Sequence, residues 1–332
     1  MPLQSVNRSI AKYGLNNLKT THRPGLTALL AQADISANQE LSPYHINYII
    51  APRLNAMGRL EHALDSLRLL CTTNSNRANL LAAKLGDTNR TRQDLTVDLL
   101  DKAKNQINQD YLSSIIIVED SDFHEGIIGL VAGKLVETYY RPAIVISKKA
   151  GVSKASARSI KGINITELIR SQSQFLLGVG GHPMAAGFSI ETAKITEFKQ
   201  VLSQYAAATI DPKLFDPSLD IDCAINSSDI NFDLYQAITQ LEPFGIGNSQ
   251  PVFALLQAEI VSLQAMGKNG NHKKLRLKQS NDLPLEALWF NAPESSAQIQ
   301  AGSIVDIAGT LSVNTWRNKT SLQLIIKDLH HL

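Results

Sequence analysis

The segment best suited to bind a phosphate group is glycine-rich and contains one histidine. Residues 178–187 hold four glycines and two alanines around His182. Glycine lets the backbone approach a ligand closely, and exposed N–H groups at Gly180 and Gly181 can bind an anion to which His182 also donates. The alternative is a tight turn between a strand and a helix, in which the small residues serve packing. Composition leaves both interpretations open.

A second candidate lies on a strand expected at 155–160. Ser156 and Arg158 are two residues apart, so their side chains point to the same face of a strand. A hydroxyl group beside a guanidinium fork is suited to bind a terminal phosphate. An exposed strand face with a structural ion pair fits the same spacing, so this alternative stays open.

A third candidate, His124, begins the segment 124–129 between an expected strand and an expected helix. Open α/β sheets bind ligands at such positions, but a histidine there can equally cap the helix. A zinc-protease helix is excluded because Ile128 stands where that motif needs its second histidine.

The short stretch 52–59 contains Arg53, Asn55 and Arg59. These side chains fit contacts with phosphodiesters. An arginine bound to backbone carbonyl groups fits the same pattern.

The candidates in the last third are basic or aromatic. The run 268–278, which includes Lys268, Lys273 and Arg276, lies in an otherwise net acidic segment and favours an anion-binding face. A solvated strand edge whose lysines block aggregation is the alternative. Phe244 is a candidate for stacking on nucleic-acid bases, although a small barrel also needs aromatic residues in its core.

The elements that must position these residues predict an α/β protein built from several parts. Residues 1–73 have the pattern of short helices, and 74–110 predict one long connecting helix with an interrupted leucine stripe. Strands and helices alternate in 111–209, which predicts an α/β domain with a mixed sheet. Short strands in 215–331 predict a small β-barrel of the oligonucleotide-binding (OB) kind.

Composition and charge exclude several classes of protein. The net charge of +2 does not by itself indicate a nucleic-acid-binding protein. Two distant cysteines argue against a disulfide framework and a zinc site. Without a signal pattern or an apolar run of membrane-spanning length, the sequence predicts a cytoplasmic protein with no membrane segment. Asp120 and Asp122 stand alone in a loop, so no metal ligand is predicted within this chain.

Together these motifs resemble the RecJ family of the DHH phosphoesterase superfamily. The similar segments occur in the family's order across nearly the whole chain, at 52–59, 124–129, 156–159, 180–187 and 242–248. Ala155, where the family usually has glycine, and Ser249, where proline is common, depart from its pattern.

The resemblance implies 5′→3′ hydrolysis of single-stranded DNA, dependent on Mn²⁺ or Mg²⁺, in recombination and repair. It implies that Ser156 and Arg158 hold the 5′ phosphate, and that the terminal barrel holds the strand farther along. Helicases or single-strand-binding proteins are expected partners. The catalytic residues implied are His182, Arg53 and His124, and the substrate-binding residues are Ser156, Arg158, Gly180, Gly181, Arg59, Asn55, Phe244, Lys273 and Arg276.

In that family the DHH domain, with its aspartate and histidine metal ligands, normally precedes these segments. The resemblance therefore implies that 1–73 is a remnant of the DHH domain, 111–209 the DHH-associated domain and 215–331 the OB-like barrel. We expect the chain to be truncated, to bind DNA weakly and not to cleave it alone. The alternatives are a stand-alone single-strand-binding module and an oligonucleotide or dinucleotide phosphodiesterase of the same superfamily.

Overall fold

The computed structural model describes residues 1–36, 39–108, 111–267, 270–279, 284–317 and 319–332. Contacts divide the chain into two compact units. Leu18–Pro217 forms one unit, and Met1–Asn17 with Ser218–Leu332 forms the other. Helix α1 (Ser5–Lys19) runs across the boundary.

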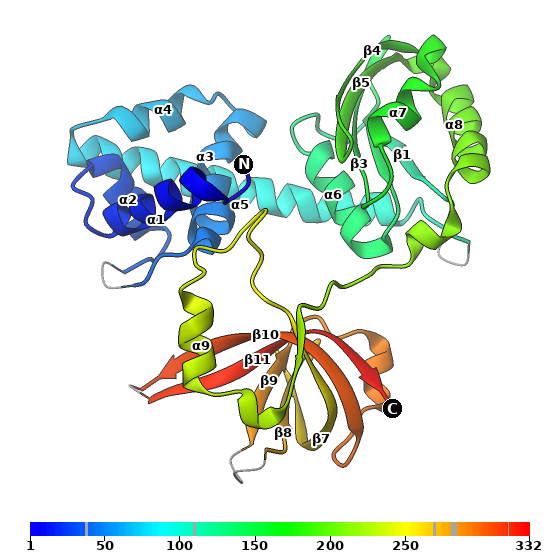
Figure 1. The fold of residues 1–332 in the computed structure, drawn as a ribbon. Helices are drawn as coiled ribbons and strands as arrows, with labels where there is room; N and C mark the ends of the chain where they lie inside the picture. Colours follow the sequence, from blue (N-terminus) through cyan, green and yellow to red (C-terminus); the bar gives the residue numbers. More distant parts are fainter. Residues whose placement is uncertain (37–38, 109–110, 268–269, 280–283, 318) are drawn as a thin grey trace. The chain divides into compact units, whose positions relative to one another are not determined.

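The helical part of the Leu18–Pro217 unit is organised by the long helix α5 (Ser75–Lys104), which begins where Asn74 caps it by accepting a hydrogen bond from the Arg77 N–H (2.9 Å). It packs against α2, α3 and α4, and also against α6 of the α/β part (Figure 1). No helix in the described part of the chain is both long and apolar enough to cross a membrane. The remaining elements here are α2 (Pro24–Gln32), the π-helical segment η1 (His45–Ile50), α3 (Ala51–Leu60) and α4 (Leu64–Cys71).

The α/β part contains a five-stranded sheet in the order β1-β2-β3-β5-β4. β1 and β2 are parallel and the other pairs are antiparallel, which confirms the predicted mixed sheet. The strands are β1 (Ile116–Asp120), β2 (Ala143–Ser147), β3 (Val152–Arg158), β4 (Leu176–His182) and β5 (Ala185–Glu191). The helices are α6 (Ile128–Tyr139), α7 (Ile165–Arg170) and α8 (Ile195–Thr209), with short 3-10 turns η2 (Ser173–Phe175), η3 (Thr192–Lys194) and η4 (Pro212–Phe215).

The two faces of this sheet pack against different helices. Ile144 and Ile146 of β2 join a core with α7 and α8, whereas Ala143 and Val145, on the opposite face, pack with α6 and the last turns of α5. We call the second side the α6 face. Strand β3 follows the same alternation, so Ala157 is buried in the α7/α8 core.

The glycine-rich segment is a β-hairpin, so the tight strand-to-helix turn considered from the sequence is wrong. His182 ends β4, and β5 begins at Ala185 after a two-residue turn. Gly180 and Gly181 therefore lie within a strand and not in a loop. Because β4 is the edge of the sheet, alternate N–H groups along it point away from the other strands.

The last third forms a closed barrel, because β7 pairs with β8 along its second half and with β10 along its first half. The parallel β9–β11 pair completes the ring, which confirms the predicted OB-like fold. The elements are β6 (Cys223–Ile225), η5 (Ser227–Asp229), α9 (Phe232–Thr239), β7 (Phe253–Met266), β8 (His272–Leu277), β9 (Leu285–Trp289), η6 (Glu294–Gln298), β10 (Ile304–Trp316) and β11 (Lys319–His331).

The first residues of the chain bind to the segment 240–248 within the barrel unit. The Leu3 N–H donates to the Ile246 carbonyl oxygen at 2.6 Å, and Arg8 Nη2 donates to the Gln240 carbonyl oxygen at 2.8 Å. A Cβ at Gly245 would lie only 2.8 Å from the Leu3 side chain. These contacts explain why Met1–Asn17 groups with the barrel, although the sequence placed 1–73 in one domain.

Candidate phosphate-binding site

Strands β3, β5 and β4 bring the two strongest sequence candidates onto one face of the sheet. The strand register forms two rows of paired residues, and both rows lie on the α6 face. The ends of a row are two strand spacings apart, or about 10 Å. The first row holds Ser156, Gly187 and Gly180, and the second holds Arg158, Ala185 and His182.

Between Arg158 and His182 the sheet presents almost no side chains. Gly180, Gly187 and His182 are all exposed to solvent. A groove of about 590 Å³ lies over the neighbouring part of the three strands, where Lys154, Gly180 and Gly187 are among its lining residues; Ser156, Arg158 and His182 do not line it. The glycines thus provide a flat floor on which a flexible ligand can lie against the backbone.

Arg158 is held at the edge of this floor by its own strand. Its Nη1 donates to the Ser156 Oγ at 3.1 Å and to the Ala157 carbonyl oxygen at 2.8 Å. Helix α6 packs directly above, and a Cβ at Gly129 would lie 3.0 Å from Ser156 Oγ and 3.1 Å from Arg158 Nη2. Burial, and then the positive charge of Arg59, lowers the pKa of the Arg158 guanidinium.

Arg59 comes from helix α3 and reaches the same region. Its Nη1 donates to the Gly126 carbonyl oxygen at 3.0 Å, just before α6 begins. The backbones approach so closely that a Cβ at Gly126 would lie 2.0 Å from the Arg59 carbonyl oxygen. Arg59 also lowers the pKa of Arg92 on α5, after the larger effect of burial. Within the described residues, neither Arg59, Arg92 nor Arg158 forms an ion pair with a carboxylate.

The other arginine of the 52–59 segment lies elsewhere. Arg53 Nε donates to Gln32 Oε1 and its Nη1 to the Ile49 carbonyl oxygen, both at 2.7 Å. These contacts match the structural alternative considered for this segment, and burial lowers the pKa of the guanidinium. Asn55 is exposed on α3 and has no described contact with Ser156 or Arg158.

His124 organises the turn before α6. Its Nδ1 accepts a hydrogen bond from the Gly126 N–H at 3.1 Å, and its carbonyl oxygen accepts from the Ile127 N–H at 2.9 Å. The ring is exposed. The imidazole thus binds the turn before the helix and not the first N–H groups of α6, and the catalytic role of His124 stays a prediction.

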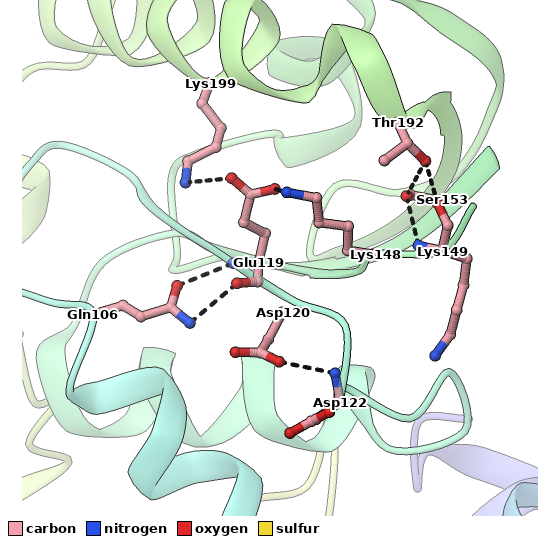
Figure 2. Close-up of polar contacts among 9 residues, drawn as sticks. All are labelled: Gln106, Glu119, Asp120, Asp122, Lys148, Lys149, Ser153, Thr192 and Lys199. Atoms are coloured by element: carbon pink, nitrogen blue, oxygen red, sulfur yellow. Dashed lines mark hydrogen bonds and ion pairs between the residues drawn. The ribbon is translucent and has the colours of Figure 1, made fainter. Parts of the chain in front are cut away.

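The acidic residues at the carboxyl end of β1 are engaged with lysines and with the backbone (Figure 2). Glu119 pairs with Lys199 at 3.2 Å and with Lys148 at 3.6 Å. Asp120 accepts from the Asp122 N–H at 2.8 Å. Among the residues with described positions, no three His, Cys, Asp or Glu side chains are grouped so that they could hold a metal.

Strand β8 divides the basic run between its two sides, and His272, Lys274 and Arg276 share the outward side, so an anion-binding face there stays a prediction. On β8, Lys273 shares the inward side with buried Leu275, and its ammonium donates to the Ser296 carbonyl oxygen. Arg276 is exposed on the opposite side, and Phe244 packs against the barrel core. Lys268 lies outside the described residues.

One residue of this region, Arg92, was not found from the sequence, and Gly129 was found only as the last residue of the 124–129 segment, without a role of its own. A signal for Arg92 was present, because it continues the buried stripe of α5 between Asn89 and Leu99. A charged residue on such a stripe indicates a specific partner. The 124–129 segment contains Gly129, but a glycine in a helix shows only that another group lies close and does not show which one.

Two family models match the chain, the DHHA1 domain over residues 108–208 and the RecJ OB domain over residues 221–328. The fold thus defines a DHHA1 domain followed by a RecJ-type OB domain.

The single-stranded-DNA-specific exonuclease RecJ of Bacillus subtilis (strain 168) is 35% identical over 99% of the chain, which covers 42% of that relative. Crystal structures of RecJ from Thermus thermophilus in complex with Mn²⁺ and with Mg²⁺ match with a TM-score of 0.86 in both cases, at 28% and 29% identity. Each match covers 99% of this chain, and 47% and 50% of those chains. The chain is a homologue of the RecJ exonucleases, as its motifs predicted, and it spans about half the length of these relatives.

Proposed function

We propose that this chain binds the 5′-phosphorylated end of single-stranded DNA as part of a single-stranded-DNA-specific 5′→3′ exonuclease. The observation that supports this best is the register that places Ser156 and Arg158 at one end of a glycine floor and His182 at the other. The B. subtilis relative is named as a single-stranded-DNA-specific exonuclease, which also supports the proposal.

In this proposal the terminal phosphate binds to Ser156 and Arg158. The Ser156 hydroxyl and the free N–H groups of the guanidinium donate to its oxygens, and Arg59 adds a second positive charge. The terminal nucleotide lies over Gly187 and Gly180, where side chains would obstruct it. His182 is then placed to donate a hydrogen bond to the next phosphate along the strand.

In this proposal the barrel is a second element that binds single-stranded DNA. OB barrels bind single strands through charged grooves and stacking platforms. Arg276 is exposed on β8 and is suited to a phosphate contact, whereas Lys273 and Phe244 serve the barrel itself.

The hydrolytic step is not assigned to the described residues. The relatives of known structure bind Mn²⁺ or Mg²⁺, but no metal centre forms among the described residues of this chain. We therefore propose that the chain binds and positions DNA without cleaving it by itself. Its cytoplasmic location and its helicase or single-strand-binding partners stay predictions.

The test compares the binding of one labelled single strand with a 5′ phosphate or a 5′ hydroxyl, measured by fluorescence anisotropy. We expect the chain to bind the 5′-phosphorylated strand more tightly. Arg158→Gln should weaken that binding by roughly tenfold to a hundredfold, because it removes a hydrogen bond between charged groups. Lys134→Gln is the control, because it removes an exposed charge from α6 that pairs with Glu137 on the same helix.

The same mixtures are then incubated with Mn²⁺. Binding that weakens with salt, without cleavage, supports the proposal. Equal affinity for the two ends would contradict it. Cleavage by the chain alone would contradict the division of roles, because metal ligands would then lie among its residues.

A further inference from the structure

Three glycines of the hairpin are not required by the packing of the protein itself. A Cβ at Gly178 or Gly180 would meet nothing within 4 Å, and one at Gly187 would make an ordinary contact at 3.6 Å. None of the three has a positive φ, whereas Gly181 has a φ of +152° and a Cβ there would lie 2.4 Å from the Ala185 carbonyl oxygen. Glycine weakens a strand, and within one it often marks the close approach of a ligand. We infer that the space above these three glycines is kept open for a ligand.

A β-bulge in β4 turns one large apolar side chain toward the same space. Leu176 and Val179 both pack into the α7/α8 core, although a regular strand would place residues three positions apart on opposite faces. The register shifts between Leu176 and Gly178, so Leu177 joins Gly178 on the α6 face. The Leu177 side chain is 55% exposed. The bulge therefore directs an exposed leucine toward the glycine floor.

The groove of about 590 Å³ is where these features meet. Val152, at the start of β3, and Leu177 line it beside the three glycines, and both side chains are exposed to solvent. Of the residues that line it, Lys154 and Ser189 carry polar side chains, and the Lys154 ammonium is paired with Glu125 at 2.8 Å. An open, mostly apolar groove with so few polar groups suits a flat ligand with apolar faces better than it suits an anion.

The groove is continuous with the proposed phosphate site. Gly180 and Gly187 share a row with Ser156 and also line the groove. Lys154, another lining residue, lies two positions before Ser156 on the same face of β3, or about 7 Å away along the strand. We propose that the groove binds the base of the 5′-terminal nucleotide, whose phosphate is held by Ser156 and Arg158. This inference rests on the function proposed above and adds to it a subsite for the base.

The lining of the groove predicts how the base is recognised. Every nucleobase has a flat face that makes apolar contacts, whereas its edge is identified by hydrogen bonds. For such hydrogen bonds the lining side chains offer the Ser189 hydroxyl and the Lys154 ammonium, which Glu125 engages. The groove should therefore accept all four bases and still distinguish a base from its absence. If the glycines are merely tolerated in an edge strand, a larger side chain at Gly178 should leave binding unchanged.

The experiment uses the full chain and one labelled, 5′-phosphorylated single strand whose terminal nucleotide carries either a base or an abasic sugar analogue. The first measurement is the ratio of the dissociation constants for the abasic and the base-bearing ends. The second is the ratio for the 5′-hydroxyl and 5′-phosphoryl forms of the base-bearing strand. The variants are Gly178→Val, which fills the groove, and Leu177→Ala, which removes part of its apolar lining. Met184→Ala is the matched control, because Met184 is 48% exposed in the turn of the same hairpin and does not line the groove.

We expect the wild-type chain to bind the base-bearing end roughly tenfold more tightly than the abasic end, as for one stacked base. The four bases should bind within about threefold of one another, because no side chain reads their edges. Gly178→Val should abolish the difference between the two ends and keep the preference for the phosphate. Leu177→Ala should reduce that difference, and Met184→Ala should leave both ratios unchanged. Since valine favours strands and a Cβ at position 178 has room, Gly178→Val should unfold at the wild-type temperature or above it.

Two kinds of failure can be told apart. An unchanged first ratio in Gly178→Val and Leu177→Ala, or equal binding of abasic and base-bearing ends by the wild-type chain, would overturn the base subsite and leave the proposed function standing. A preference of more than about tenfold for one base would overturn recognition by apolar contact alone. A wild-type protein without any preference for the phosphate would instead overturn the proposed function itself.

Discussion

Gly129→Ala tests the site without removing any polar group. Gly129 lies in the first turn of α6, above β3. The added methyl carbon would stand 3.0 Å from Ser156 Oγ and 3.1 Å from Arg158 Nη2. Both neighbours are the ends of side chains, so they can move by a few tenths of an ångström and leave the backbone in place.

The expected effects on folding and on binding differ. Alanine in place of a helical glycine stabilises a helix by roughly 0.5–1 kcal/mol, which offsets part of the cost of crowding Arg158. We therefore expect the free energy of unfolding to change by less than about 1 kcal/mol. The crowded groups are the proposed phosphate ligands, and a displaced charged hydrogen bond is worth about 1.5–3 kcal/mol. Affinity for a 5′-phosphorylated strand should fall roughly tenfold to a hundredfold.

The assay is anisotropy with 5′-phosphoryl and 5′-hydroxyl strands, beside urea denaturation of the same preparations. Gly133→Ala is the control, because it lies one turn later in α6 and its Cβ would meet nothing within 4 Å. It should gain stability and keep its preference for the phosphate. If Gly129→Ala also keeps that preference, the terminal phosphate does not bind between α6 and β3, and the reasoning fails.

Three further substitutions test other parts of the structure. Gly126→Ala should destabilise the protein by about 1–3 kcal/mol in urea denaturation, because the new Cβ would lie 2.0 Å from the Arg59 carbonyl oxygen. Unchanged stability would mean that the backbones at Gly126 and Arg59 lie farther apart. The hydrogen bond from Lys84 is the largest cause that lowers the pKa of Asp65. That carboxylate stabilises the fold above its unfolded pKa of about 3.9, and this stability is lost as pH falls through the lower folded value. Lys84→Met should therefore make unfolding less sensitive to pH between about 3 and 5, and an unaltered pH profile would count against the pair. In the barrel, Arg276→Ala should reduce the slope of log affinity against log salt by about 1, whereas Lys273→Met should leave it unchanged; equal effects would mean that the two side chains share a face.

The strands of the α/β part were predictable within a few residues, because β1 and β2 are runs of β-branched residues. The hairpin was not, because β4 contains Gly178, Gly180 and Gly181, and glycine disfavours strands. Pairing with β5, itself held by β3, overrides that local preference. The sequence of β4 alone therefore does not predict a strand, because its conformation depends on pairing with β5.

The arginines show a second limit of sequence reasoning. Arg53 and Arg59 belong to one motif, but six residues turn an α-helix by about 600°, so their side chains point roughly 120° apart. One therefore reaches Gln32 and the other Gly126. Periodicity could separate the two arginines once the helix was known, but it could not show which one faces the sheet.

The location of the site follows from the mixed topology of the sheet. The rule that ligands bind at the carboxyl ends of parallel strands pointed to the segment after β1. Only β1 and β2 are parallel here, and the acidic residues at that end are engaged with lysines and with the backbone. The antiparallel strands β3, β5 and β4 instead place paired residues side by side on the α6 face. On β5 and β4 these residues include Gly187 and Gly180, so the backbone there is exposed to solvent. A site on the face of a sheet needs partners from a layer above it, and in the proposed site helices α3 and α6 provide Arg59 and Gly129. Arg59 and Arg158 are 99 positions apart in the sequence, and the long helix α5, which packs against both α3 and α6, holds the elements that carry them together.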